Sequence, residues 1–590
     1  MIIGKHVNKF YLKYFLFFLF GVIALVVVDY FQLEIPVICK NILNGVSDGS
    51  LFGDDSKILE YMKYLGLIAV IMFCGRFTWR YCVLGVAARI EGDLREDMFI
   101  HAEKLSNQYY KKHKTGALMA LFTNDLQTIR QSFGSGTIML IDAIFLGGFA
   151  LYRMFKCNWI LASFSLIPMV LIALVSVIVG RVMEQKFKAR QEAYDNLSDF
   201  AQENFSGIAV IKAFVKEIHE IRHFDKLNQE NYDKNINFVR YATLLNVLLS
   251  AIISSIIAIL FGAGSYFVVN DFTFNGASFG GGELFEFIAY FDTLVWPFMA
   301  IAQLINMRAQ AKASYDRISE LLEEPVEIVD ENTVDIEALQ GKIEFRHLTF
   351  KYPDGSDNVL ENICFTIEAG EMVGIIGKTG CGKTTVVDLL LRTYNVEENQ
   401  ILLDDKDIMH LPFRKVRDSI GYVPQDNFLF SDTIANNIAF AYEELDYQKV
   451  EAAAKLADVH NNIIEFNDKY ETILGERGVT LSGGQKQRVS IARALVKNPA
   501  ILIFDDSVSA VDTKTEETIL SNLRNLRKGK TTIMIAHRIS TVETLDKIIV
   551  MDDGRVAGIG THEELLKSNA IYQEMVRLQS LEKEVNGGEA

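Results

Sequence analysis

The sequence predicts an α-helical transmembrane domain followed by an α/β domain, and three observations support this order. Half of the 590 residues are hydrophobic, and they are concentrated before about residue 308. After about residue 342 the pattern changes to short β-like runs separated by helical ones. One of these runs leads into a glycine-rich turn, GKTGCGKT, which opens a helix.

Six apolar segments are each near or above the ~20 residues that cross a bilayer. We place these spans at residues 15–44, 58–88, 132–154, 158–181, 241–270 and 283–307. Residues 5–14 mix lysines with apolar side chains, which predicts a short helix in the membrane interface. No small-residue cleavage site follows the first apolar run, so we expect this run to be retained in the membrane.

The distribution of lysine and arginine predicts the orientation. Residues 89–130 and 182–240 are rich in both and are expected to form long cytoplasmic helical extensions. Loops 45–57 and 270–282 are poor in basic residues and are expected outside. The turn with Arg153 and Lys156 is also expected outside, which is a small violation of the rule. An even number of spans then leaves both termini in the cytoplasm.

Ionisable residues inside the predicted spans each cost about 3 kcal/mol at mid-bilayer. They are Asp29, Glu34, Arg76, Arg80, Asp142 and Asp292. Two interpretations stay open at this point. The residues line a polar pathway, in which the four acids would suit a cationic amphiphile, or they pair with one another and snorkel to the interface.

Net charge and cysteine spacing exclude other classes. A net charge of −16 argues against nucleic-acid binding, which needs a basic face. The six cysteines include no CxxC pair, so we expect free thiols, with neither a disulfide framework nor a metal site.

The turn GKTGCGKT matches the G-x4-G-K-[ST] phosphate loop between a strand and a helix. Its glycines let backbone N–H groups close around phosphates, Lys383 adds positive charge, and the Thr384 hydroxyl binds Mg²⁺. An α/β P-loop NTPase domain is therefore predicted. Its expected phosphate-binding residues are Gly377, Lys378, Thr379, Gly380, Cys381, Gly382, Lys383, Thr384 and Thr385.

Other residues of this half suit a nucleotide site. Asp505 and Asp506 follow an apolar strand, and a strand ending in an acid is where such folds hold Mg²⁺. Tyr352 lies ahead of the phosphate loop and can stack on adenine. Gln425 can ligate Mg²⁺ and orient water, and His537 follows a strand where it can reach a γ-phosphate. Each of these residues taken alone is more often structural.

In order along the chain, these residues form a set that resembles the ATP-binding-cassette ATPase domain. The set comprises Tyr352, GKTGCGKT, Gln425, GERG (475–478), LSGGQ (481–485), ILIFDD, SAVD and His537. The preceding spans resemble the membrane domain of six-helix, type IV ABC exporters. We therefore expect a membrane domain at 1–320, a linker at 321–340, a cassette at 341–580 and a flexible tail at 581–590.

The resemblance implies that two cassettes dimerise head to tail and hold ATP between the phosphate loop of one chain and the LSGGQ turn of the other. The residues expected to serve the partner's ATP are Ser482, Gly483, Gly484, Gln485 and Asp512. GERG would pass the state of the cassette to the membrane half. Residues 115–125 and 202–217 look like the family's two segments that carry coupling helices.

One residue departs from the family pattern. The family usually has Glu after the strand-end Asp, as the general base, and this chain has Asp506. Asp is one methylene shorter, and a shortfall of roughly 1 Å can cost about 100-fold in rate. Asp506 resembles the Asp-bearing, degenerate-site subunit of bacterial heterodimeric multidrug exporters. A homodimer in which Asp506 works adequately is the alternative.

The expected function is ATP-driven export of small amphipathic compounds across the plasma (inner) membrane, with Mg²⁺ and a second half-transporter as partners and no nucleic acid. A peptide or lipid exporter and a metal-chelate importer are alternatives on the same fold. No protease-like segment precedes the spans, which disfavours a leader-peptide exporter. An ATP-gated channel or sensor is the alternative of another class.

Overall fold

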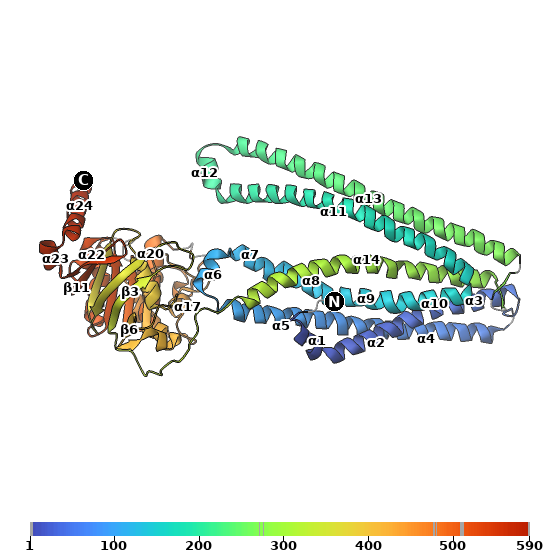
Figure 1. The fold of residues 1–590 in the computed structure, drawn as a ribbon, viewed down its shortest axis with the longest axis horizontal. Helices are drawn as coiled ribbons and strands as arrows, with labels where there is room; N and C mark the ends of the chain where they lie inside the picture. Colours follow the sequence, from blue (N-terminus) through green and yellow to red (C-terminus); the bar gives the residue numbers. More distant parts are fainter. Residues whose placement is uncertain are drawn as a thin grey trace. The chain divides into compact units, whose positions relative to one another are not determined.

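The computed structural model describes residues 4–52, 54–270, 272–274, 277–475, 478, 481–507 and 513–587. The chain divides into two compact units. The helical unit comprises Met1–Glu103 and His113–Glu324, and the α/β unit comprises Lys104–Lys112 and Pro325–Ala590. Long helices make up the first unit, and β-sheets flanked by helices make up the second (Figure 1). The predicted fold class is confirmed.

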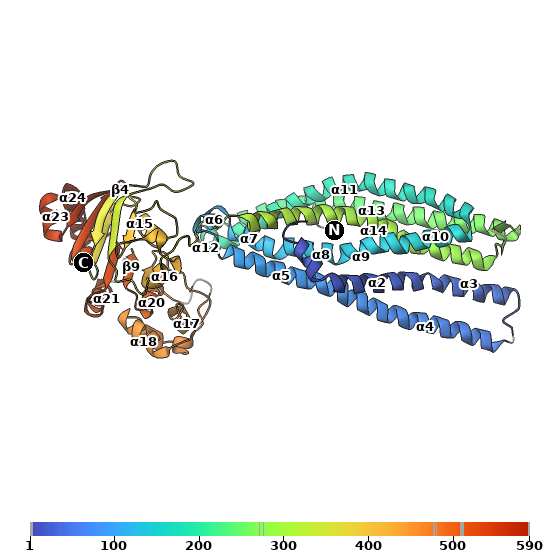
Figure 2. The same ribbon diagram turned by 60° about the horizontal axis from the view of Figure 1, so that its bottom comes forward.

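The first helices of the helical unit form an antiparallel pair, which Figure 2 shows from the side. One arm is α2 and α3, separated at Leu33, and the other is α4, which continues through a π-helical turn into α5. Their bounds, with those of the short first helix, are α1 (Asn8–Lys13), α2 (Phe15–Gln32), α3 (Glu34–Ser47), α4 (Asp55–Trp79), η1 (Arg80–Leu84) and α5 (Gly85–Ala102).

The predicted interfacial helix is tied to α5 by its lysines. Lys9 and Lys13 form ion pairs of 2.5 Å with Asp97 and Asp93. The Tyr14 hydroxyl also donates to Asp93, at 2.9 Å. The charged face of α1 is therefore held against a helix of the same unit.

The next span is also interrupted by π-helical turns, which often occur at functional positions. Its bounds are α7 (Thr115–Ala120), η2 (Leu121–Asp125), α8 (Leu126–Phe133), α9 (Ser135–Ile141), η3 (Asp142–Leu146) and α10 (Gly147–Cys157). The last π-helical turn begins at Asp142, one of the predicted intramembrane acids.

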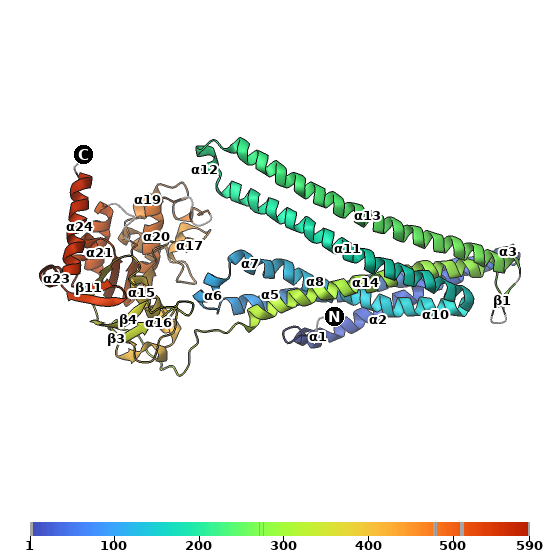
Figure 3. The same cartoon turned by 45° about the horizontal axis from the view of Figure 1, so that its top comes forward.

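Two very long helices, α11 (Trp159–Ser206) and α13 (Glu217–Val269), run side by side and are joined by the short α12 (Ile208–Ala213) (Figure 3). The short strands β1 (Thr273–Phe274) and β2 (Ala277–Ser278) follow, and α14 (Gly281–Glu323) completes the unit. Around α12, residues such as Val210, Phe214 and Val215 are exposed, so this tip presents apolar side chains.

Within the described residues, five helical stretches are long and apolar enough to cross a membrane. They are Phe15–Ser47, Asp55–Ala102, Thr115–Cys157, Glu217–Val269 and Gly281–Glu323, and each overlaps a predicted span. The remaining predicted span, 158–181, lies in α11. The side chains of 168–177 in that helix lie outside the described part of the chain.

The α/β unit contains, in its described part, a six-stranded sheet with the order β12-β11-β5-β10-β9-β8 and a four-stranded sheet with the order β4-β3-β6-β7. Neighbouring strands of the larger sheet are parallel except β12. Its bounds are β5 (Met372–Gly377), β8 (Ile420–Val423), β9 (Ile501–Asp505), β10 (Thr531–Ala536), β11 (Lys547–Asp552) and β12 (Arg555–Gly560). The smaller, antiparallel sheet comprises β3 (Ile343–Phe350), β4 (Leu360–Ile367), β6 (Ile401–Leu403) and β7 (Lys406–Asp407).

The larger sheet is covered on both faces, because alternate residues of a strand point to opposite sides. In β9, Leu502 and Phe504 belong to one apolar core, and Ile501 and Ile503 belong to the other. The helices of the unit are α6 (Asn107–Lys112), α15 (Lys383–Leu390), α16 (Phe413–Ser419), α17 (Ile434–Ile438), α18 (Tyr447–Leu456), α19 (His460–Ile464), α20 (Gly483–Val496), α21 (Thr513–Leu526), α22 (Ile539–Val542), α23 (His562–Ser568) and α24 (Ala570–Gly587).

The C-terminal helix differs from the sequence expectation. We expected residues 581–590 to form a flexible tail, but α24 continues to Gly587, so 581–587 are helical. Tyr572 anchors this helix in the core, and Met575 and Val576 pack against the same core. Because residues 572, 575 and 576 lie on one face of the helix, burial of that face stabilises the turns that follow.

Candidate functional site

Strand order brings the predicted nucleotide-binding residues to one edge of the larger sheet. Strands β5, β10, β9 and β8 are parallel neighbours, so their carboxyl ends lie side by side, where α/β sheets bind ligands. Gly377 ends β5 and Asp505 ends β9. His537 directly follows β10, and Gln425 is exposed in the loop after β8. Segments more than 150 residues apart in sequence therefore meet here.

The phosphate loop needs glycine at two tight positions. Gly382, the N-cap of α15, has φ +96°, and a Cβ there would lie 2.6 Å from the Leu360 side chain. A Cβ on Gly377 would lie 2.3 Å from the Met551 carbonyl oxygen. Only residues without a side chain allow the backbone this path, which carries successive N–H groups around a phosphate-sized turn.

Lys383 lies inside the loop and is only 6% exposed. Its ammonium group donates to the carbonyl oxygens of Gly377 and Lys378 at 2.8 and 2.9 Å. Burial lowers the pKa of Lys383, while the nearby carboxylates of Asp505 and Asp506 act in the opposite direction. The loop thus encloses a cation placed for phosphate oxygens.

Two oxygen ligands that suit Mg²⁺ lie together beyond the loop. The Thr384 hydroxyl donates to one carboxylate oxygen of Asp505 at 3.2 Å, and Tyr422 donates to the other at 3.3 Å. Asp505 is 2% exposed, and this burial raises its pKa. Among the described residues, no group of three His, Cys, Asp or Glu could hold a metal alone. The pair fits Mg²⁺, which is usually bound by one or two protein ligands plus phosphates.

Asp506 adopts an unusual backbone conformation next to His537. Its φ of +45° lies in the left-handed region that non-glycine residues rarely adopt, and such strain often marks functional positions. Its N–H donates to the Ile535 carbonyl oxygen at 2.9 Å, which fixes the turn after β9. The His537 Nε2 atom lies 4.0 Å from a carboxylate oxygen of Asp506.

Tyr352 follows β3 and lies near the helix that begins at the phosphate loop. Its hydroxyl lies 3.0 Å from the Thr385 hydroxyl, and its ring lies edge-on to Tyr394, with 5.2 Å between centroids. The Lys111 ammonium group donates to the Tyr394 hydroxyl at 3.1 Å and lies 5.4 Å from the Tyr352 ring centroid. A lysine from α6 therefore supports the aromatic pair.

Sequence reasoning missed Lys111, Tyr394 and Tyr422. In the sequence, Lys111 is only one of many basic residues in 89–130. No local pattern distinguishes Tyr394 or Tyr422 from other tyrosines. Residues 104–112 belong to the α/β unit, whereas 115–125 belong to the helical unit.

The LSGGQ turn forms a capping box at the start of α20. The Ser482 hydroxyl accepts from the Gln485 N–H at 3.3 Å, and the Gln485 side chain accepts from the Ser482 N–H at 3.0 Å. Ser482 and Gly483 are exposed. The S-x-x-Q spacing is a sequence signal for this cap that the motif-based reasoning did not use. Asp512 and residues 476–477 of GERG lie outside the described residues.

The comparisons with known proteins identify the family of the chain. Residues 18–298 match the family model of the ABC transporter transmembrane region, and residues 360–509 match that of the ABC transporter. The chain is 35% identical over 587 residues to the probable multidrug resistance ABC transporter ATP-binding/permease protein YheI of Bacillus subtilis, covering 99% of each chain. This chain belongs to the ABC transporter family.

Further relatives support the same assignment. The multidrug resistance-like ATP-binding protein MdlA of Escherichia coli is 35% identical, over 96% of this chain and 94% of its own length. The structure of a bacterial Atm1-family ABC exporter with ATP bound covers 97% of this chain and 98% of its own, at 26% identity and a TM-score of 0.76. This ABC transporter is thus a multi-pass membrane protein that binds ATP, an ATPase coupled to transport.

In the membrane half of the transporter, the ionisable residues of the predicted spans differ in their contacts. Glu34 forms an ion pair with Arg153, the residue that departed from the predicted charge distribution. The nearby Lys40 pairs with Glu286 at 2.7 Å. For Glu34, therefore, the interpretation of internal pairing is the one that the contacts support.

Asp29 and Asp142 are buried inside the helical unit, with 3% and 8% exposed. Trp296 donates to one oxygen of Asp142 at 2.9 Å. The second oxygen of Asp142, and one oxygen of Asp29, have no hydrogen-bond partner among the described residues. Asp292 is exposed on the surface of this single chain.

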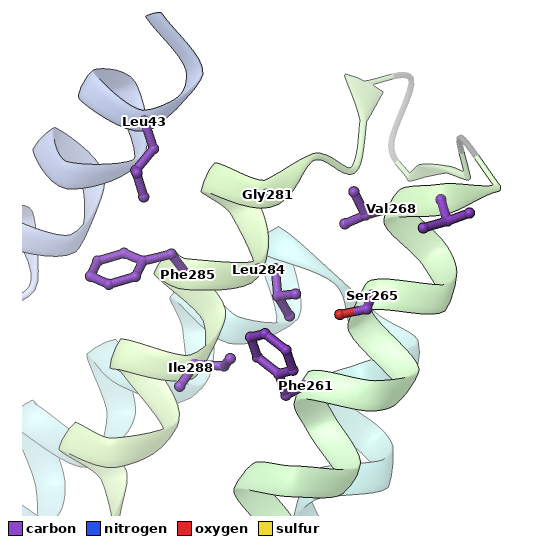
Figure 4. A pocket seen from close by; sticks show the side chains of 9 residues that line it. Leu43, Phe261, Ser265, Val268, Gly281, Leu284, Phe285 and Ile288 are labelled. Atoms are coloured by element: carbon purple, nitrogen blue, oxygen red, sulfur yellow. The ribbon is translucent and has the colours of Figure 1, made fainter. Parts of the chain in front are cut away.

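Two cavities lie beside the transmembrane helices. One, of about 440 Å³, is formed by α3, α13 and α14, and Ser265 is its polar side chain among apolar ones such as Leu43, Phe261 and Phe285 (Figure 4). The other, of about 500 Å³, is formed by α3, α4 and η1, and Arg76 and Arg80 line it. The cavities thus carry arginines and apolar groups, and neither is lined by the four predicted acids.

Proposed function

We propose that this chain is one half of an ATP-driven exporter of amphipathic compounds and acts in a heterodimer with one degenerate ATP site. The observation that carries the proposal is Asp506, an aspartate beside the Mg²⁺-suited Asp505 and 4.0 Å from His537. The names of the relatives YheI and MdlA, which refer to multidrug resistance, support the substrate class. We place the transporter in the plasma membrane with both termini in the cytoplasm.

In the proposed site, Tyr352 stacks on adenine, and the N–H groups of residues 378–383 surround the phosphates. Lys383, already enclosed by the loop, donates to phosphate oxygens. Thr384 and Asp505, with Gln425 from the loop after β8, would hold Mg²⁺, and the ion would supply positive charge against the phosphates.

Hydrolysis requires a base that orients water and a donor to the γ-phosphate. Asp506 takes the first role and His537 the second. Because the Asp side chain is one methylene short, water is oriented less well, and we expect a rate about 100-fold below that of a Glu-bearing site. The left-handed backbone at Asp506 fixes where its side chain begins, so the backbone offers little adjustment for the missing length.

The LSGGQ turn of this chain would complete the partner's site. The capping box holds Ser482 and Gln485, and α20 presents its N-terminus and exposed Gly483 to an anion. Asp512 would lie in the contact between cassettes. The partner would therefore receive an intact signature turn and perform the faster hydrolysis.

One observation favours a second candidate, the export of an anionic amphiphile such as a phosphorylated lipid. Arg76 and Arg80 lie one helical turn apart and line the same cavity, together with apolar residues such as Phe73 and Phe77. The Arg80 guanidinium lies over the Trp79 ring, 5.4 Å from its centroid. One relative, 32% identical over 89% of this chain, is the ATP-dependent lipid A-core flippase of Syntrophus aciditrophicus.

Reconstitution in liposomes tests both candidates. We expect the chain alone to hydrolyse ATP slowly, and its complex with a Glu-bearing half-transporter to show substrate-stimulated hydrolysis and uphill dye transport. Full activity of the chain as a homodimer would contradict the heterodimer proposal, and flux that only follows the gradient would contradict the pump. Loss of fluorescent-phospholipid movement, with cationic-dye transport retained, in Arg76→Gln/Arg80→Gln would favour the second candidate.

A further inference from the structure

The loop that carries His537 is held by a residue of the C-terminal helix. The side-chain amide of Gln579, in α24, donates to the His537 carbonyl oxygen at 2.6 Å. Its oxygen accepts from the Ile539 N–H at 2.7 Å. One amide therefore bridges the two backbone groups on either side of Arg538, between the end of β10 and the start of α22.

The orientation of this amide follows from its partners. A carbonyl oxygen can only accept and a backbone N–H can only donate, so the amide nitrogen must face His537 and the amide oxygen must face Ile539. The amide group of Gln579 thus uses its donor and its acceptor, and only one orientation of the amide satisfies both backbone partners. A Leu side chain offers neither, and a carboxylate cannot donate to His537.

The position of Gln579 is set by packing of the helix. Tyr572, Met575 and Val576 contact the core that also contains Ile539 and Val542 of α22. Residue 579 lies on the same face, two turns after Tyr572. Tyr572 is fully buried, and its hydroxyl lies 2.7 Å from His562 Nδ1, which ties α24 to α23. The amide is thus presented by a helix that core packing and the Tyr572–His562 contact also hold in place.

We propose that Gln579 is a positioning residue for His537, so that the C-terminal helix controls the geometry of ATP hydrolysis. The imidazole reaches toward Asp506 from a loop that follows β10, and its own side chain is about one-third exposed, so packing alone does not fix it. The backbone bridge limits where the loop can place the imidazole relative to the γ-phosphate. The inference rests on the proposed role of His537.

The main test is Gln579→Leu in the full-length chain purified alone in nanodiscs, where only this chain's own site hydrolyses ATP. Losing both hydrogen bonds should lower kcat about tenfold and leave the KM for ATP within about twofold, because no group that contacts nucleotide is removed. The matched control is Gln573→Leu, on the same helix, where the amide donates to the Leu566 carbonyl oxygen at 2.7 Å. This control should keep the wild-type kcat.

The second measurement separates positioning from a general structural effect. In a His537→Ala background, adding Gln579→Leu should cause no further loss, because the group being positioned is already absent. An equal fractional loss in both backgrounds, or a wild-type kcat for Gln579→Leu, would overturn the inference. If His537→Ala itself kept full activity, the proposed role of His537 would fail instead, so the two failures are distinguishable.

Discussion

In the α/β unit, Asp505 and Asp506 lie at the end of β9 beside hydroxyl and imidazole groups, whereas in the helical unit Glu34 is held by Arg153. The first arrangement holds carboxylates at the edge of the sheet where α/β folds bind ligands, and the second neutralises a carboxylate within the protein. Acidic residues therefore have different roles in the two units. At converging strand ends they suit ligand binding, and in the membrane region they form ion pairs that stabilise the fold.

The environments explain this contrast. Parallel strands bring several carboxyl ends to one sheet edge, where a Mg²⁺ ion bound with a nucleotide would compensate the carboxylate charge. A transmembrane helix offers no such edge, so a buried charge needs a partner from a neighbouring helix. Lys40 and Glu286 repeat the pattern of Glu34 and Arg153.

The largest effect should come from lengthening the side chain of Asp506 in the α/β unit. Asp506→Glu restores the missing methylene, and we expect this chain's own site to hydrolyse ATP up to about 100-fold faster. Steady-state ATPase of the full-length chain alone measures this. Asp505→Asn in the same background is the control and should abolish the gain, because a Mg²⁺ ligand is lost. An unchanged rate would mean that the length of the side chain at position 506 does not limit the rate of hydrolysis.

A smaller effect should follow from breaking the pair in the helical unit. Glu34→Gln leaves the Arg153 guanidinium with a weaker partner in the membrane region, which should cost about 1–3 kcal/mol of stability. The thermal unfolding midpoint in nanodiscs should fall, while the KM for ATP stays the same. The double variant Glu34→Gln/Arg153→Gln should recover part of the loss. A Glu34→Gln variant that unfolds at the wild-type temperature but loses substrate stimulation would instead assign Glu34 to the pathway.

The smallest effect concerns Lys111, which belongs to the α/β unit although its neighbours in sequence are membrane helices. Lys111→Met removes the hydrogen bond to Tyr394 and the cation over the Tyr352 ring, so adenine should bind less well. We expect the KM for ATP to rise about threefold, within the range of a cation–π contact. Lys112→Met is the adjacent control and should leave KM unchanged. Equal shifts in both variants would point to charge alone.

Much of the fold could be predicted from the sequence, because its signals are local. Apolar length marked the transmembrane segments, and GKTGCGKT combined a strand, a turn and a helix in consecutive residues. The π-helical turns were not predicted, since a single extra residue per turn leaves the apolar pattern almost unchanged. The end of the C-terminal helix was predicted too early in the sequence, because the last turns of this helix are polar.

The sequence by itself determined the order of the two units and the residues whose chemistry suits a nucleotide, because each of these depends on neighbours in the chain. Only the tertiary structure decided that Tyr422 supports Asp505, that Lys111 supports Tyr352 and that Gln579 holds the backbone of His537. The physical reason is that these contacts depend on strand order and helix packing. Both join residues tens to hundreds of positions apart and leave no local pattern.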